Sequence, residues 1–130
     1  MIKAITLFFT IFLSNLRQVD TKVRQAIYES SIPQDCKKFF TAITIFESNW
    51  HTNKRAIKTM NFSGFMVHGK LKKFETLPHY INFTEHWFKR KHIENRKDFV
   101  HLILNGKYAK QSESNCRKYL SNIVRIEKSL

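Results

Sequence analysis

Apolar residues recur at intervals of three and four along most of this chain, and that spacing constrains its fold more than any other feature. One series comprises Leu16, Val19, Val23 and Ile27, and a second comprises Phe39, Ile43, Phe46 and Trp50. Residues at this spacing lie on one face of an α-helix. Only 3 Gly and 2 Pro interrupt the 130 residues, so we predict a mostly helical protein.

The length and charge of the chain limit its class. A chain of 130 residues with 42% hydrophobic residues is the size of one domain and can bury a core. Its 23 Lys+Arg and 10 Asp+Glu leave a net charge of +13. Such an excess favours polyanions, namely nucleic acid, an anionic membrane or an acidic wall polymer, and does not choose among them.

The first 16 residues form the most apolar segment. One lysine, Lys3, precedes a run of about ten mostly apolar residues, a pattern typical of a short secretory signal. The residues after the run, Ser14 to Leu16, make a poor cleavage site, so a first core helix or an uncleaved anchor stays open. We therefore expect a signal peptide or hydrophobic helix over 1–16 and one domain over 17–130. No run reaches the roughly 20 apolar residues of a further membrane span.

The middle of the chain predicts a helix followed by a hairpin. The second apolar series predicts a helix over 34–49, which should be central and the most buried, and a short helical piece ends near Met60. The segment from Gly64 to Phe74 has the pattern of a small hairpin. We expect a type II′ turn at Gly69–Lys70, because glycine suits the first position of that turn.

Three further helices complete the expected fold. Thr76 is the expected cap of a helix with Pro78 in its first turn. Another helix over about 97–105 should stop at Gly106, and Ser112 or Ser114 should open the last one. The predicted fold class is α+β, mostly helical, with one small hairpin. A central helix that brings a carboxylate to its end, followed by a hairpin, is the plan of a lysozyme-like domain.

Four short segments resemble a known family. The stretch Phe46–Trp50 is similar to the E-S-G-W-G segment of bacterial glucosaminidases, which are peptidoglycan hydrolases with a lysozyme-like core. Asn61–Phe65 looks like the family's N-x-F-G-I step, Leu71–Thr76 resembles its F-R-x-Y-x-S segment, and Asn105–Ala109 resembles its G-Y-A-T turn. The matches keep the family's order and cover about 34–125. Asn49 and His51 depart from it, replacing the small residues on either side of the tryptophan.

The resemblance implies a secreted, periplasmic or envelope-associated glycosidase that cleaves N-acetylglucosaminyl bonds of peptidoglycan. It implies a hydrolase, rather than an amidase, that acts on glycan strands as a monomer and without a cofactor. Glu47 is the expected general acid, and Glu75, just after the hairpin, is the candidate base or stabilising carboxylate. Tyr108, Trp50 and Phe74 are the candidates for substrate binding. A host enzyme and a phage-borne one both fit this description.

The residues around Glu47 support an acid role on physical grounds. Phe40, Ile43 and Trp50 lie within one or two helical turns of Glu47 and would partly desolvate its carboxyl group. Desolvation raises a carboxyl pKa above its ordinary value of roughly 4.3. A raised pKa keeps the group protonated near neutral pH, as general acid catalysis requires. The alternative is an ordinary surface glutamate at a helix end.

Several alternatives stay open. A lytic transglycosylase on the same fold also needs one essential glutamate, and a non-catalytic basic protein that binds nucleic acid or cell wall would explain the charge. We expect no sequence-specific nucleic-acid binding, because no groove-reading element is evident. The six histidines form no H-E-x-x-H pattern, so we expect no metal. Cys36 and Cys116 are either free thiols or, in an exported protein, one disulfide.

Overall fold

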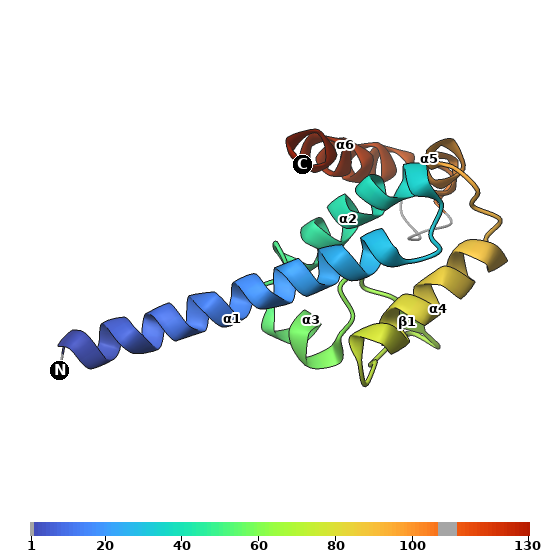
Figure 1. Ribbon diagram of the computed structural model, residues 1–130. Helices are drawn as coiled ribbons and strands as arrows, with labels where there is room; N and C mark the ends of the chain where they lie inside the picture. Colours follow the sequence, from blue (N-terminus) through green and yellow to red (C-terminus); the bar gives the residue numbers. More distant parts are fainter. Residues whose placement is uncertain (1, 107–111) are drawn as a thin grey trace.

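The computed structural model describes residues 2–106 and 112–130 and has six helices and a two-stranded antiparallel sheet in that part of the chain (Figure 1). The elements are α1 (Ile2–Glu29), α2 (Gln34–Ser48), α3 (Lys54–Thr59), β1 (Met66–Val67), β2 (Lys70–Leu71), α4 (Leu77–Arg90), α5 (Arg96–Leu104) and α6 (Glu113–Ser129). The predicted class, mostly helical α+β with one small hairpin, is confirmed.

The central helix is α2, as predicted. However, only Phe39 and Ile43 of the predicted apolar series are buried, whereas Phe46 and Trp50 are exposed. Helix α2 packs against α1, α5 and α6, and nine of its 15 residues are buried.

The neighbouring helices α4 and α5 supply further core aromatics. Phe39 of α2 meets Phe99 edge to face at 5.2 Å between ring centroids, and Phe40 meets Phe88 at 5.5 Å. Such aromatic pairs add to the free energy gained by apolar burial.

Helix α1 is one continuous helix from Ile2 to Glu29. Its C-terminal half contacts α2 and α4, with Val23 and Ile27 buried, whereas its N-terminal half projects away from the other helices (Figure 1). The helix passes without a break through the boundary expected at residues 16 and 17. No helix in the described residues is both long and apolar enough to cross a membrane.

Local capping explains where the helices begin. The Thr76 side chain accepts a hydrogen bond from the His79 amide at the start of α4, and the Ser112 side chain accepts one from the Asn115 amide at the start of α6. Both residues were expected as helix starts, because a side-chain oxygen satisfies an amide that has no partner in the first turn. Gly106 follows α5 with a φ of 70°, as expected for a helix stop.

The hairpin turn is displaced by one residue from its expected place. Val67 pairs with Lys70, so the two central turn residues are His68 and Gly69, with φ angles of 51° and 76°. Positive φ at both positions defines a type I′ turn. The predicted type II′ turn at Gly69–Lys70 is therefore wrong, because His68 adopts the left-handed conformation that the prediction reserved for glycine.

Candidate active site

A cleft of about 360 Å³ lies where the C-terminal end of α2 faces α3 and the hairpin. Its lining includes Glu47 from α2, Arg55 from α3, Gly64 before β1, and Met66 and Leu71 from the two strands. Among the described residues that line the cleft, Glu47 is the one carboxylate. The central helix thus brings an acid to the boundary between the helical body and the hairpin.

Two segments far from α2 in sequence hold the Glu47 carboxyl group. The hydroxyl of Tyr119, on α6, donates a hydrogen bond of 2.8 Å to Glu47 Oε1. On the other side, Gly64 comes so close that a Cβ added to it would lie 3.5 Å from Glu47 Oε2. The Tyr119 ring also packs edge to face on Phe46, with 5.4 Å between centroids. Both carboxyl oxygens therefore have defined neighbours.

The surroundings of Glu47 raise its pKa. Desolvation by the surrounding protein is the larger effect and raises the pKa, and the Tyr119 hydrogen bond opposes it by favouring the carboxylate. The side chain nevertheless keeps an exposed surface, so a ligand in the cleft can reach it. A carboxyl that is both accessible and more readily protonated than an ordinary glutamate suits the role of a general acid.

The chain leaves α2 through three consecutive residues in the left-handed region. Asn49, Trp50 and His51 have φ angles of 51°, 60° and 61°, and this conformation costs a non-glycine residue roughly 1–2 kcal/mol. Contacts of His51 hold the segment in place. The His51 ring is fully buried, with Nδ1 2.7 Å from Asp20 Oδ1 of α1 and Nε2 2.8 Å from the Thr44 hydroxyl of α2.

Burial and two polar neighbours act on the His51 ring. Burial lowers the pKa of His51, and the hydrogen bond and charge of Asp20 only partly oppose this effect. Nδ1 donates to the Asp20 carboxylate, and Nε2 lies 2.8 Å from the Thr44 hydroxyl, which itself donates to the Thr41 carbonyl at 2.7 Å. This order of acid, imidazole and hydroxyl is that of a nucleophilic triad, but the Thr44 side chain is fully buried and cannot reach a substrate. The contacts of His51 with Asp20 and Thr44 therefore hold α1 against the C-terminal end of α2.

Glu75 and Trp50, two of the other predicted site residues, do not line the cleft. Glu75 is exposed and lies outside its lining. Trp50 is 49% exposed and follows α2 directly, within three residues of Glu47, but is not a lining residue either. Tyr108, the remaining candidate for substrate binding, falls outside the described residues.

Phe74 occupies the core rather than a ligand-facing position. Its side chain is only 1% exposed, and its ring contacts Tyr80 and Phe83 at centroid distances of 5.3 and 5.2 Å. The expectation that Phe74 contacts substrate is corrected accordingly, because a side chain enclosed on this scale has no surface for a sugar. Its aromatic character serves the packing of α4 beneath the hairpin.

Two residues that shape the site were not singled out from the sequence. Asn61 donates from Nδ2 to the carbonyls of Phe65 and Lys72 and accepts from the Phe65 amide, which fixes the turn that carries Gly64 to Glu47. Its signal was present in the Asn61–Phe65 match. Tyr119 had no local signal, because it lies 72 residues from Glu47 in sequence.

The described residues contain no group of three or more His, Cys, Asp or Glu side chains that could hold a metal ion. Cys36 and Cys116 are both buried and are not joined by a disulfide. Comparisons of the chain with protein-family models, with curated proteins and with solved structures find no match.

Proposed function

We propose that this protein is a peptidoglycan hydrolase with a lysozyme-like domain that cleaves N-acetylglucosaminyl bonds, with Glu47 as its general acid. The observation that carries the proposal is the Glu47 carboxyl group, which lies in an open cleft, has a raised pKa and is oriented by Tyr119. The four family-like segments in family order support the choice of substrate. The protein would act as a monomer outside the cytoplasmic membrane, where the glycan strands lie.

Glycosidic cleavage assigns a specific task to Glu47. Its proton passes to the bridging oxygen as the bond between that oxygen and the anomeric carbon breaks, which leaves an oxocarbenium-like centre on the sugar. The Tyr119 hydroxyl, which donates to Oε1, then stabilises the carboxylate that forms. Water adds to the anomeric carbon and returns a proton to the carboxylate, so the enzyme is regenerated.

A lytic transglycosylase is the second candidate, and the composition of the cleft favours keeping it. Glu47 is the one carboxylate among the described lining residues, and a glycosidase with two catalytic carboxylates would hold a second acid about 5–10 Å away. With one acid, the substrate's own acetamido group can stabilise the anomeric carbon. Alternatively, a hydroxyl of the same sugar can replace water and give an anhydro-muramyl end.

Substitution of Glu47 tests the proposal. We expect Glu47→Gln to abolish lysis of purified peptidoglycan while binding to the wall and the unfolding temperature are kept, because glutamine preserves the shape of the side chain and cannot donate the proton. Glu94→Gln is the matched control, since Glu94 is exposed in the loop between α4 and α5. Lysis by the Glu47 variant at the parent rate would refute the site assignment.

Glu75 provides a second comparison. A mechanism with a single carboxylate predicts that Glu75→Gln retains most of the activity, because Glu75 is exposed and does not line the cleft. A loss comparable to that of Glu47→Gln would instead assign Glu75 the role of base or stabilising carboxylate. The two variants differ from the parent by the same loss of one acidic group, so an effect of net charge alone would appear equally in both.

A further inference from the structure

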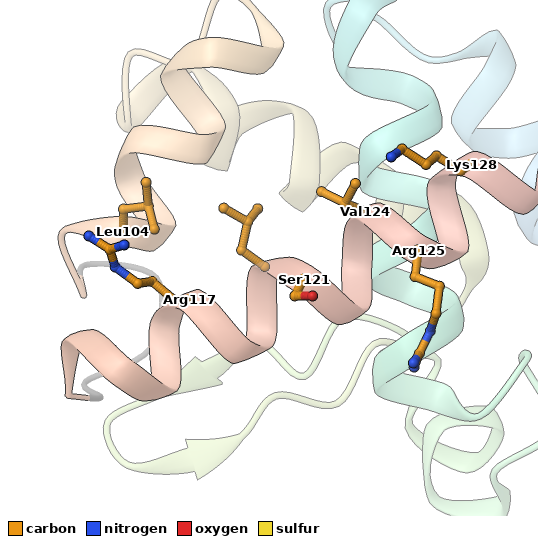
Figure 2. A pocket seen from close by; sticks show the side chains of 7 residues that line it. Leu104, Arg117, Ser121, Val124, Arg125 and Lys128 are labelled. Carbon is orange, nitrogen blue, oxygen red and sulfur yellow. The ribbon is translucent and has the colours of Figure 1, made fainter.

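A second depression lies between α5 and α6 and shares no lining residue with the Glu47 cleft. This α5–α6 groove has a volume of about 670 Å³, within the range of small-molecule sites in proteins. In Figure 2, Leu104 of α5 and Arg117 of α6 lie at one end, and Lys128 lies near the other. The groove therefore follows the length of α6 rather than its tip.

The groove combines an apolar floor with a cationic border. Leu104, Leu120 and Val124 supply the apolar surface, and Arg117, Arg125 and Lys128 supply the charge. None of the described residues that line it is acidic. Leu104 is 38% exposed, which is a large apolar surface for the last turn of a helix. A ligand that fits this lining has both an apolar part and an anionic part.

The order of these residues along α6 separates the two kinds of surface. Leu120 and Val124 are one turn apart on α6 and line the groove together with Leu104 of α5. Arg125 and Lys128 are three residues apart, or about 4.5 Å along the helix axis, and their long side chains extend in different directions from α6 in Figure 2. An acyl chain on the floor would place its headgroup within reach of this cationic pair.

We propose that the α5–α6 groove binds anionic phospholipid, with an acyl segment on the apolar floor and the phosphate at Arg125 and Lys128. The net charge of +13 draws the whole molecule to an anionic bilayer, and each basic residue near such a surface contributes about 1 kcal/mol. A nucleic acid fits less well, because no described lining residue is aromatic and able to stack on a base.

Vesicle co-sedimentation tests the cationic border. The full chain is mixed with vesicles of phosphatidylcholine alone or of equal parts phosphatidylcholine and phosphatidylglycerol. We expect binding to the anionic vesicles only, weakened about tenfold or more in Arg125→Gln/Lys128→Gln. Arg90→Gln/Lys91→Gln is the matched control, since it removes one Arg and one Lys from exposed positions at the end of α4. Equal losses in both pairs would mean attraction by net charge and would overturn the proposal.

Leu104→Asn tests the apolar floor separately from the charge. This variant should weaken binding to anionic vesicles and leave binding to duplex DNA unchanged, because it removes apolar contact and no charge. Val67→Asn is its control, with a side chain 37% exposed on the hairpin. Unchanged vesicle binding by Leu104→Asn would overturn the proposal, as would stronger binding to DNA than to vesicles that depends on Arg125 and Lys128. Thermal unfolding of each variant shows that the fold is kept.

Discussion

At the scale of single residues, the central contact is the hydrogen bond from Tyr119 to Glu47. The hydroxyl lowers a pKa that desolvation raises, so its removal should raise the pKa of Glu47 further. Activity that needs protonated Glu47 is lost as pH rises through this pKa. We therefore predict that Tyr119→Phe moves the alkaline limb of the rate–pH profile to higher pH and lowers the plateau by no more than about tenfold.

The pH profile separates this positioning role from simple packing. Loss of packing alone would scale the rate at every pH by the same factor and leave the midpoint of the alkaline limb unchanged. The phenylalanine ring keeps the edge-to-face contact with Phe46, so it isolates the hydroxyl. If the midpoint of the alkaline limb in Tyr119→Phe is unchanged, or lies at lower pH than in the parent, the electrostatic account is contradicted.

His51 predicts a pH dependence of stability. Its pKa is lowered in the folded protein by burial, so the unfolded chain binds the proton more readily. The free energy of unfolding should therefore fall as pH decreases below the ordinary histidine pKa of 6.5. Denaturant unfolding at a series of pH values measures this free energy, and an NMR titration from about pH 8 to about pH 5 measures the pKa of His51 itself. His51 should stay neutral below the ordinary histidine pKa of 6.5, and a His51 pKa above that value would contradict the account.

At the scale of elements, the turn before β1 and the turn of the hairpin offer a matched pair. Gly64 and Gly69 have nearly equal φ angles, 71° and 76°, so alanine at either position should cost roughly 1–2 kcal/mol of stability. Only at Gly64 does the new methyl group lie against Glu47 Oε2, whereas the space beside Gly69 is open. We predict that both variants lose similar stability and that only Gly64→Ala loses most of its activity.

Activity assays and thermal unfolding of the two glycine variants check this prediction. Gly64→Ala should bind and cleave poorly even at temperatures where it is fully folded, because the methyl group occupies the approach to the carboxyl group. Equal activity in the two variants would show that the contact between Gly64 and Glu47 does not shape the cleft.

The elements themselves were largely predictable, because their signals are local. The apolar series of α2 and the caps Thr76 and Ser112 each depend on a few neighbouring residues. The hairpin was found but its turn was misplaced, since glycine suits either central position of a two-residue turn and nothing marked His68 for a positive φ. The apolar start of α1 was ambiguous because a signal segment and a core helix share its composition.

At the scale of the whole molecule, the site depends on how elements distant in sequence pack together. Short sequence patterns do not predict that packing. α6 packs along α2 and brings Tyr119 to Glu47. Near the opposite end of α6, Arg96 binds Glu127 with two hydrogen bonds of 2.9 and 2.7 Å. The motif around Glu47 was enough to choose it as the acid. No neighbouring residues in the sequence indicate that Tyr119 contacts Glu47 or that Phe74 lies in the core. Phe74 was chosen by analogy with a motif and serves the core instead.

The same packing keeps the two cysteines apart. Cys36 follows Asp35, whose carboxylate accepts from the Arg96 amide, and Arg96 binds Glu127. Cys116 lies about three turns earlier on α6 than Glu127, or about 16 Å along the helix, whereas a disulfide needs Cα atoms within about 7 Å. Burial, helped by Asp35, raises the pKa of the Cys36 thiol to about 12, so it stays protonated.

We therefore predict two thiols that are unreactive in the folded protein and reactive once it unfolds. Alkylation with iodoacetamide under non-reducing conditions, followed by intact-mass measurement, should add no label to the native protein and two labels in denaturant. A reducing agent should leave the unfolding temperature unchanged. A denatured chain that takes up no label before reduction would reveal a disulfide and contradict the arrangement of α2 and α6.

The central claim is that Glu47 is the acid that cleaves the glycan strand, and mass spectrometry of the soluble fragments tests it most directly. Peptidoglycan is incubated with the parent protein and with Glu47→Gln. The account predicts fragments with reducing N-acetylglucosamine ends from the parent and none from the variant, and anhydro-muramyl ends would assign the transglycosylase reaction to the same acid. Equal fragments from both proteins, or none from either, would contradict it.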